Sequence, residues 1–402
     1  DLTDRRTRAL RTKAMKIVKA ELWHVQLPMK FTFRTSQGAV ARRDTLILAI
    51  TDDEGRIGYG EAVPFVDPFY TAETLDASYQ FLQEHYLPLL PGRELAEALA
   101  LHDERIALLT KKLGQSIQAL YPMALAGVEN ALLNLWYEVH NENTVAAMLG
   151  EPLGTVIPGG VVIGDMSIPD VLMTTKKYVQ AGYKRVKLKI SPKDGYDRLA
   201  AVRQEFPDLV LAADANRSYP LEAAPLVARL QDLKLASLEE SFQVPSGMKA
   251  ATVYQNLQAQ GFDCKALPLC FDESVQSLRE LQEMYATGAM TALNIKVGRL
   301  GGLRQAVQCI QFCRQNGIGF WIGSMVESSI SKMLHVQLAA LSDVWMAGDL
   351  SDSSRYFAED LTEPALVFTD GYMAVPQGPG LGTVVQRQRI EQLAVRHVDF
   401  TA

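Results

Sequence analysis

Residues 184–214 read KRVKLKISPKDGYDRLAAVRQEFPDLVLAAD, in which a helix-like segment separates two strand-like runs. The alternation continues downstream, because further short β-rich runs are each followed by helix-like sequence. Repeated βα units are typical of a parallel sheet. About eight strand candidates lie between residues 158 and 349, which predicts a closed or nearly closed barrel. Besides the two runs quoted, the candidates include VVIG, ASLEE (236–240), LPLCFDE (267–273), ALNIK (292–296), IGFWIG and DVWMAGD (343–349).

Five side chains of the types needed for metal-assisted proton abstraction lie at or near the ends of these runs. In an α/β barrel the active site lies at the C-terminal ends of the strands, where the βα loops begin. The predicted fold would therefore gather three carboxylates between two amines. The five residues are Lys189, Asp214, Glu239, Asp272 and Lys296.

The N-terminal part of the chain has a different pattern from the barrel repeats. Residues 16–60 read as strands and turns, whereas residues 72–149 have apolar positions every three or four residues, as helices do. The predicted fold class is therefore α/β, a (β/α)7–8 TIM-like barrel with an N-terminal α+β capping domain. The predicted division is residues 1–14, a disordered leader or expression remnant; 15–149, the capping domain; 150–360, the barrel; and 361–402, a C-terminal segment that returns to the capping domain.

The first barrel helix has clear start and stop residues in the sequence. Ser167 is suited to cap its N-terminus, and Pro169 fits the first turn. Gly182 tolerates the left-handed backbone geometry common at a helix C-terminus.

The composition favours a globular protein that acts on small molecules. The net charge of −6 and the absence of a long Lys/Arg run argue against a nucleic-acid partner. The sequence has no apolar stretch of about 18 residues, so we expect a cytoplasmic protein without a membrane partner. Its 4 cysteines include no CxxC pair and are predicted to be structural thiols. No sequence feature identifies an interface, so homo-oligomerisation stays open.

Three carboxylates from successive strands predict a site for a hard divalent cation. Oxygen ligands suit Mg²⁺ or Mn²⁺, whereas zinc more often recruits His or Cys, and no histidine occurs between His140 and His335. Asn216 would point to the same side as Asp214 if the strand continues and would add a polar contact. The alternative interpretation is that the acids cap the following helices. The predicted metal ligands are Asp214, Glu239 and Asp272.

The lysine pair predicts a base inside the barrel. Lys187 and Lys189 alternate with apolar residues, so both side chains point to one face of the strand, which is the interior in a barrel. Mutual repulsion and desolvation are expected to lower the pKa of at least one of them. An outward-facing pair is the alternative. Lys296 is expected on the far side of the metal, so that a substrate would have an amine on each face.

This arrangement predicts removal of a proton alpha to a carboxylate. The second lysine would return the proton in a racemase, whereas one lysine would serve as acid and base in a β-elimination. Sequence order does not separate the two. A lysine that forms a Schiff base, as in aldolases, and a non-catalytic binding protein on a decayed barrel are more distant alternatives.

In combination and order, the motifs resemble the enolase superfamily, specifically its muconate-lactonising branch, in which an α+β domain caps the barrel. The resemblance extends over nearly the whole chain from Met15. Within the branch, PFYTAET (68–74) and GDLSDSSRYFAED (348–360) are similar to the group of o-succinylbenzoate synthases and N-succinylamino acid racemases. The other matching motifs are GYGEAVP (58–64), KLK (187–189), DANRSY (214–219), LEE (238–240), DES (272–274), NIKVGRLGG (294–302) and GSMVES (323–328).

The resemblance implies a role for each residue of the site. Lys189 would be the base, Lys187 its neighbour that tunes it, and Lys296 the lysine of the opposite face. The three carboxylates would bind Mg²⁺, with Mn²⁺ as a substitute. Arg34 and Phe69, from two loops of the front domain, would contact the remote end of the substrate, although a simple surface-loop role is an equal alternative. The residues implied to bind or shape the carboxylate end are Gly323, Ser324, Met325 and Glu327.

Two departures from the family pattern affect these assignments. Ser241 stands where the family usually has proline, and the segment before Asp272 is long, so Glu240 is the fallback for Glu239 as metal ligand. Ser354 precedes Arg355 where an acid is more usual. The leading expectation is Mg²⁺-dependent syn-dehydration that forms o-succinylbenzoate for menaquinone biosynthesis. Racemisation of N-succinylamino acids is the close alternative, and either substrate is a carboxylate that bears a succinyl group.

Overall fold

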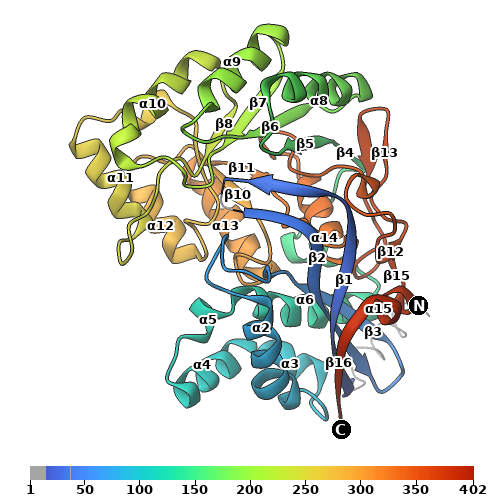
Figure 1. Ribbon diagram of the computed structural model, residues 1–402. Coiled ribbons are helices and arrows are strands. Elements are labelled where there is room, and N and C mark those ends of the chain that lie inside the picture. Colours follow the sequence, from blue (N-terminus) through green and yellow to red (C-terminus); the bar gives the residue numbers. More distant parts are fainter. Residues whose placement is uncertain (1–14, 37) are drawn as a thin grey trace.

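The computed structural model describes residues 15–36 and 38–402 of the chain. The expectation for residues 1–14 lies outside these described residues. Two main sheets organise the structure, a parallel one from the middle of the chain and an antiparallel one mainly from its N-terminal part (Figure 1).

The middle of the chain forms the predicted βα alternation. Within the described residues, 7 parallel strands lie in the order β11-β10-β9-β8-β7-β6-β5, so each strand pairs with its neighbours in sequence. The helices lie on the outer side of the sheet (Figure 1), and the predicted fold class is confirmed. The strands are β5 (Gly160–Ile163), β6 (Arg185–Lys189), β7 (Val210–Asp214), β8 (Ser237–Glu239), β9 (Leu269–Phe271), β10 (Ala292–Ile295) and β11 (Gly319–Ile322).

A segment without regular strand structure fills the eighth position of the barrel. The prediction of a strand at 343–349 is wrong, because the backbone hydrogen bonds there are too widely spaced for a β-ladder. Trp345 N and Asp349 N donate to carbonyls of β11 at 2.9 and 3.0 Å, yet they are four residues apart, whereas ladder bonds are evenly and more closely spaced. On the other side, Gly160 N of β5 donates to Leu350 O at 3.0 Å. The segment therefore joins β11 to β5 and closes the barrel.

The first barrel helix, α8 (Ile168–Ala181), begins and ends as the sequence predicts. The Ser167 side chain accepts a bond from Asp170 N, Pro169 lies in the first turn, and Gly182 adopts the left-handed conformation with φ of 100°. The other barrel helices are α9 (Gly195–Glu205), α10 (Ala224–Arg229), α11 (Ala250–Ala259), α12 (Leu278–Ala286), α13 (Leu303–Asn316) and α14 (Ser329–Ala339).

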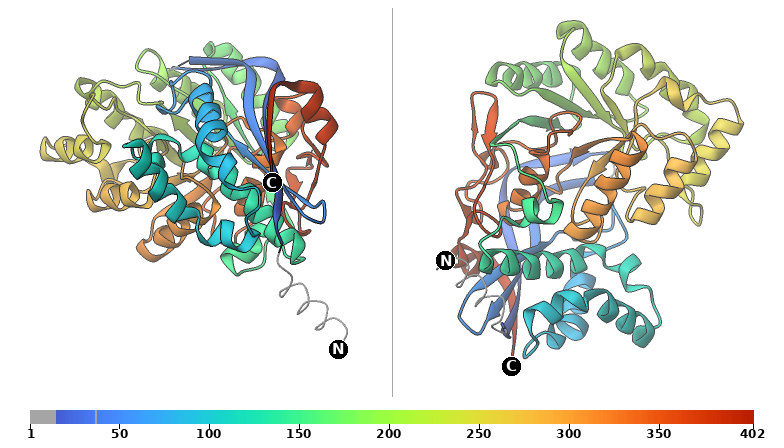
Figure 2. Two further views of the ribbon diagram at one scale, coloured as in Figure 1. Left: turned by 90° about the horizontal axis from the view of Figure 1, so that it is seen from below. Right: turned by 180° about the vertical axis from the view of Figure 1, so that it is seen from behind.

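The antiparallel sheet combines strands from both ends of the described chain. Its order is β16-β1-β2-β3, in which β1 (Ile17–Thr35) and β2 (Gly38–Asp52) form a long hairpin. β3 (Ile57–Ala62) lies at one edge and β16 (Ala394–Thr401) at the other (Figure 2). The helices that accompany this sheet are α2 (Leu75–Phe81), α3 (Leu95–Ala100), α4 (His102–Leu113), α5 (Ile117–Leu120), α6 (Pro122–Val139) and α7 (Thr144–Leu149).

Glu61 of β3 connects the antiparallel sheet to the barrel. Its carboxylate accepts bonds from Ser328 N at 3.1 Å, Ser328 Oγ at 2.7 Å and Ser331 N at 3.0 Å, all at the start of α14. Helix N-termini bind anions because their first amides have no partner within the helix. The GYGEAVP motif thus supplies a carboxylate that caps a barrel helix from the other sheet.

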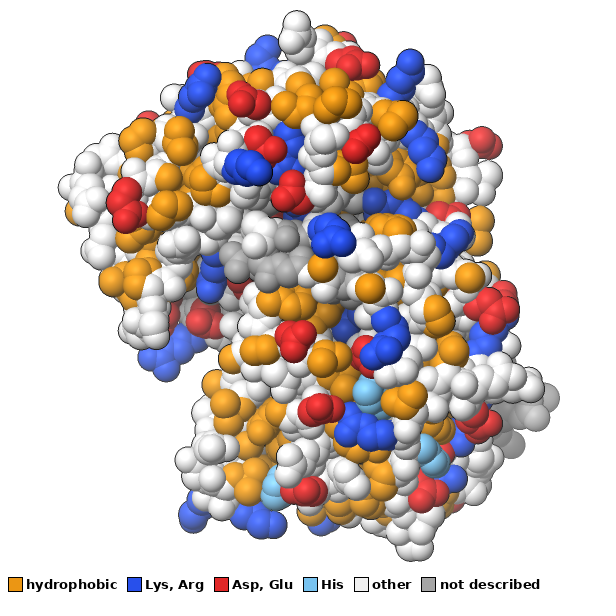
Figure 3. All heavy atoms as spheres, viewed as in Figure 1, with side chains coloured by type: hydrophobic (Ala, Val, Ile, Leu, Met, Phe, Trp, Pro, Cys, Tyr) orange, Lys and Arg blue, Asp and Glu red, His pale blue; other side chains and the backbone are white. Residues whose placement is uncertain are grey.

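The surface, the cysteines and the lengths of the helices show no unusual feature in the described residues. On the face in Figure 3, basic and acidic side chains are interspersed with apolar ones. All 4 cysteines are buried and free, as expected for structural thiols. No helix in the described parts of the chain has the length and apolarity needed to cross a bilayer.

We predict that Gly60→Ala destabilises the protein, because α6 packs directly on β3 at this point. A Cβ at position 60 would lie 2.1 Å from Gly127 O, a backbone atom that side-chain rotation cannot move away. Urea denaturation should show a loss of about 2 kcal/mol or more in the free energy of unfolding. The control is Gly378→Ala, where the nearest atom is 3.7 Å away and little change is expected. Equal effects of the two changes would contradict this account of the packing.

Candidate active site

Strand β6 carries three cationic side chains into the barrel. Arg185, Lys187 and Lys189 alternate along the strand and are 0%, 2% and 8% exposed. The predicted inward orientation of the lysine pair is confirmed by their bonds to carboxylates of other barrel segments. Lys189 Nζ donates to Asp214 Oδ2 at 2.7 Å, and the two residues are paired in register on β6 and β7.

Lys187 lies deeper and is held by two carboxylates. Its Nζ donates to Glu239 Oε2 at 2.6 Å and to Asp349 Oδ2 at 2.7 Å. Burial opposes its charge, but Asp349 and Glu239 outweigh burial and raise its pKa. Lys187 is therefore not a lysine with a lowered pKa, because two carboxylates hold its charge. Arg185 Nη2 also donates to Asp349, at 2.5 Å.

Lys296 mirrors Lys189 on the other side of the carboxylates. Its Nζ donates to Asp272 Oδ2 at 2.8 Å. Burial disfavours its charge, yet the attraction of Asp272 prevails and raises its pKa. The sheet order therefore places the predicted residues in one row, with a lysine at each end. From β6 to the end of β10 the row is Lys189, Asp214, Glu239, Asp272 and Lys296.

The central carboxylate of the row belongs to Glu239. Its Oε1 accepts from Asn294 Nδ2 at 2.7 Å, and its Oε2 accepts from Lys187. Burial, followed by the neighbouring acids, raises the pKa of Glu239 to about 7 even though Lys187 lowers it. Asn294 was not singled out from the sequence, although it lies two positions before Lys296 and so had to face the same side.

Glu240 binds the protein's own backbone. It accepts bonds from Asp272 N at 2.9 Å, Ser274 N at 2.8 Å and Ser274 Oγ at 2.7 Å, and it pairs with Arg217. Its φ of 44° lies in the left-handed region, which turns the chain directly after Glu239. Glu240 therefore fixes the start of the DES segment and is not free to act as the fallback metal ligand.

The carboxylates fit a divalent cation by their chemistry. Within the described residues, no group of three or more His, Cys, Asp and Glu side chains lies ready to hold a metal ion, and each predicted ligand accepts a hydrogen bond from a lysine or an amide. All three are buried oxygen donors at adjacent strand ends, which suits Mg²⁺ or Mn²⁺. Their function as ligands stays a prediction.

Tyr70 brings the capping part of the chain onto the barrel mouth. Its hydroxyl donates to Asp272 Oδ1 at 2.5 Å, and Lys296 Nζ lies 4.7 Å from the centre of its ring. Arg299 Nη1 donates to the same Asp272 oxygen at 2.6 Å. The sequence does not reveal Tyr70, because a loop residue has no periodicity that fixes its direction.

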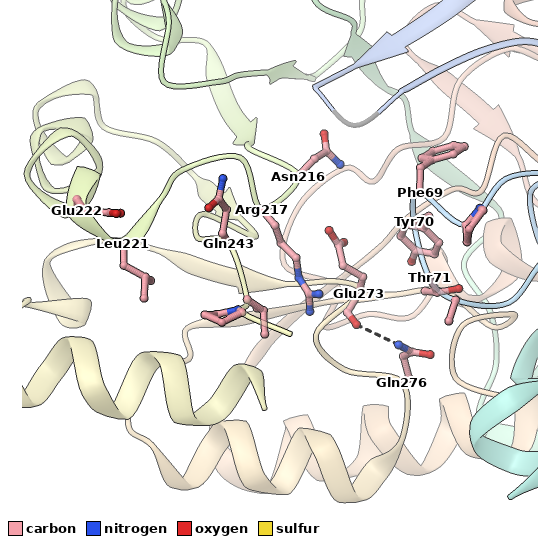
Figure 4. Close-up of a pocket in the computed structure, with 14 residues that line it drawn as sticks. Phe69, Tyr70, Thr71, Asn216, Arg217, Leu221, Glu222, Gln243, Glu273 and Gln276 are labelled. Atoms are coloured by element: carbon pink, nitrogen blue, oxygen red, sulfur yellow. Dashed lines mark hydrogen bonds between the residues drawn. The ribbon is translucent and has the colours of Figure 1, made fainter. Parts of the chain in front are cut away.

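A pocket of about 860 Å³ opens beside this row (Figure 4). Predicted residues Asn216 and Phe69 line it, and Asn216 N donates to Asp214 Oδ1 at 2.9 Å. Figure 4 shows Arg217 and Glu273 near its centre, with Tyr70 on one side. The Glu273 side chain is buried and its Oε2 has no hydrogen-bond partner among the described residues.

The GSMVES segment is internally bonded in a way that changes its expected role. Gly323 N donates to Ile295 O at 2.9 Å, and Met325 N donates to Glu327 Oε2, so these two amides are already used. They do not offer the free backbone donors expected from the resemblance. Ser324 Oγ also donates to Glu327, at 3.0 Å, and Glu327 Oε1 lies 2.7 Å from Nδ1 of His335.

Gly323 instead provides space for the row. A Cβ at this position would lie 2.7 Å from Lys296 Cε and 2.1 Å from Asn294 Oδ1. Arg34 lies apart from this group, at the tip of the β1–β2 hairpin, where it lines a smaller cleft.

Comparisons with known proteins agree with the geometry. A family model described as "Enolase C-terminal domain-like" matches residues 170–389. An o-succinylbenzoate synthase from Enterococcus faecalis is 32% identical over 377 residues, which cover 94% of this chain and 97% of that protein. An N-succinylamino acid racemase from Thermus thermophilus is 33% identical over 389 residues, covering 95% and 98%. An enolase-superfamily crystal structure from Listeria innocua has a TM-score of 0.83 and 31% identity, covering 96% and 99%.

We predict that Asp349→Asn lowers stability, because it leaves Arg185 without its ion pair and Lys187 with one carboxylate. The loss at pH 7 should be about 3 to 5 kcal/mol in the free energy of unfolding, as for other broken buried pairs. Burial opposes ionisation, but Lys187 and Arg185 lower the pKa of Asp349 from 3.8 to about 2. The part of the stability linked to this shift is therefore complete above pH 3.8 and is lost as pH falls through about 2.

Chemical denaturation of both proteins between pH 7 and pH 2 measures this effect. The difference in the free energy of unfolding between wild type and variant should shrink by about 2 kcal/mol as the pH falls from 7 to 2. Asp343→Asn is the control, since its ion pair with Arg314 is partly exposed and should contribute under about 1 kcal/mol. A difference in the free energy of unfolding between wild type and Asp349→Asn that grows as pH falls would contradict the assignment of this pKa shift to Asp349.

Proposed function

The chain belongs to the enolase superfamily, and on this basis we propose that it is an o-succinylbenzoate synthase. Such an enzyme removes water from a hydroxycyclohexadiene carboxylate that bears a succinyl group. The observation that carries the proposal is the row of three buried carboxylates with a lysine at each end. Relatives with this printed name align over nearly the whole chain.

In this proposal Lys189 acts as both base and acid. Its Nζ takes the proton from the carbon alpha to the substrate carboxylate, and the electron pair left behind delocalises into that carboxylate. The C–O bond to the β-hydroxyl then breaks and the ring double bond forms. Lys189 returns its proton to the departing hydroxyl, which leaves as water, so a single lysine on one face accounts for syn-elimination.

The other two lysines act by charge. Lys296 stays protonated, since its environment raises its pKa, and it faces the developing negative charge from the opposite side. Lys187 holds the Glu239 carboxylate in place through its 2.6 Å bond. In this proposal these residues therefore stabilise charge while Lys189 removes the proton and returns it.

The predicted metal ligands would hold Mg²⁺, with Mn²⁺ as a substitute. When bound, the ion supplies positive charge that stabilises the negative charge developing on the substrate carboxylate. The cytoplasmic location and the place in menaquinone biosynthesis stay predictions. The residues that would hold the ion are Asp214, Glu239 and Asp272.

N-succinylamino acid racemase activity is the second candidate. The observation that favours it is the near-symmetry of the two lysine–aspartate pairs, at 2.7 and 2.8 Å. Proton removal by Lys189 and return by Lys296 would invert the alpha carbon, and the reverse transfer would serve the other enantiomer. The two activities use the same first half-reaction, so one site can perform both.

We predict that the purified protein with Mg²⁺ dehydrates the cyclohexadiene substrate and that Lys189→Ala lowers kcat by about 10³-fold. Absorbance reports dehydration, and polarimetry with each enantiomer of N-succinylphenylalanine reports racemisation. Lys265→Ala changes an exposed lysine away from the row and is the control. Racemisation without detectable dehydration would make the racemase the primary activity.

A chelator should abolish either activity, and addition of Mg²⁺ should restore it. Full activity in chelator, together with borohydride trapping of a carbonyl substrate, would replace the proposal with Schiff-base chemistry. Activity that survives in both Lys189→Ala and Asp272→Ala would contradict the assigned site.

A further inference from the structure

The backbone that carries Lys296 is supported differently from the backbone that carries Lys189. Lys189 is the last residue of β6, and the amide that follows it, Ile190 N, donates to Asp214 O at 2.9 Å. The backbone bonds to β7 therefore continue past this lysine. β10 ends at Ile295, one residue before Lys296, so its ladder stops short of the second lysine.

A side chain of α14 supplies the support that the ladder does not give. The amide that follows Lys296, Val297 N, donates to Nε2 of His335 at 2.9 Å. Both residues are buried, with Val297 0% and His335 1% exposed. Because water is excluded there, loss of the bond would leave a buried N–H without a partner. His335 therefore holds the chain at the residue next to Lys296.

The other ring nitrogen fixes the orientation of His335. Since Nε2 accepts a bond from an amide, the ring proton lies on Nδ1. Nδ1 donates to Glu327 Oε1 at 2.7 Å. The second oxygen of Glu327 accepts from Ser324 Oγ and Met325 N, which fixes this carboxylate in turn. The ring is thus held between the segments that follow two neighbouring strands, β10 and β11.

The position of the Val297 amide bears on the ammonium group of Lys296, because the two residues share a peptide bond. Lys296 Nζ donates to Asp272 Oδ2 at 2.8 Å and lies 4.7 Å from the centre of the Tyr70 ring. These contacts fix the end of the side chain, whereas its Cα depends on the backbone beside it. A displacement of about 1 Å at a reacting group can lower a rate about 100-fold.

We propose that His335 is a positioning residue that holds Lys296 on the face of the substrate opposite Lys189. This inference rests on the proposed function, because it takes Lys296 as the group that faces the substrate there. Lys189 has its own backbone support in β6, so loss of the His335 bond affects one face of the site and spares the other. A general loss of stability would not produce this asymmetry.

Two amide substitutions separate this role from a general structural one. Gln places an acceptor oxygen two bonds beyond Cγ, where the ring places Nε2, whereas the oxygen of Asn is one bond closer and does not reach Val297 N. With Mg²⁺, His335→Asn should lower kcat for dehydration about tenfold or more while KM stays within about twofold of wild type. His335→Gln should retain most of the wild-type kcat.

Exchange of the substrate α-hydrogen in D₂O resolves the two faces. Proton NMR follows the exchange for each enantiomer of N-succinylphenylalanine, and Lys189→Ala and Lys296→Ala identify the lysine that acts on each enantiomer. His335→Asn should slow exchange on the Lys296 face about tenfold or more and keep exchange on the Lys189 face within about twofold of wild type.

Gln337→Asn is the matched control, because Gln337 is a buried residue of the same helix whose Nε2 donates to Leu381 O at 2.8 Å, in the C-terminal segment. Its kcat and both exchange rates should stay within about twofold of wild type. If His335→Asn fails to fold by circular dichroism, His335→Met replaces it, since a thioether is a weak acceptor and suits a buried position.

Equal losses of kcat in His335→Asn and His335→Gln, equal losses on the two faces, or wild-type rates in His335→Asn overturn the inference alone. If the wild type performs only one of the two reactions, the comparison for that reaction decides. A wild type that neither dehydrates the cyclohexadiene substrate nor exchanges the α-hydrogen overturns the proposed function and the inference with it.

Discussion

Buried positive charge is the constraint on which this barrel depends. An ammonium or guanidinium group in a protein interior is tolerated only when acids and hydrogen bonds replace water. Strand β6 places three such groups inside, and acids from other segments match each of them. The same ion pairs that satisfy the interior also align the residues of the proposed site. One set of contacts thus stabilises the fold and positions the residues of the proposed site.

The pairing extends beyond the strands themselves. Asp349 neutralises Arg185 and Lys187 from a segment that has no strand geometry, so electrostatics stabilise a closure that the backbone ladder leaves incomplete. The antiparallel sheet adds Glu61 at the start of α14 and Tyr70 at Asp272. The capping part of the chain is therefore a structural component of the barrel mouth, and it also forms one wall of each pocket described.

Residues on regular strands were predictable because their direction follows from alternation. The inward pair on β6 and the order of the acids at the ends of β7 and β8 and directly after β9 could be read from period two and from the βα repeat. The contacts of Asp349 and Tyr70 could not, since they lie 162 and 202 residues from their partners Lys187 and Asp272 in irregular segments. The raised pKa of Lys187 could not be predicted for the same reason, because one of its two acids, Asp349, lies in such a segment. The internally bonded amides of Gly323 and Met325 likewise depend on a loop conformation.

The late position of Asp349 has a consequence for biosynthesis. A ribosome delivers β6 more than 150 residues before Asp349, and β1 long before β16, its neighbour in the antiparallel sheet. A nascent chain that has reached β11 holds the cations of β6 with an acid missing, and its first long strand still has an unpaired edge. Assembly of a complete interior must therefore wait until Asp349 and β16 have been made, and until then the unmatched cations and the unpaired strand edge favour aggregation of the partly made chain.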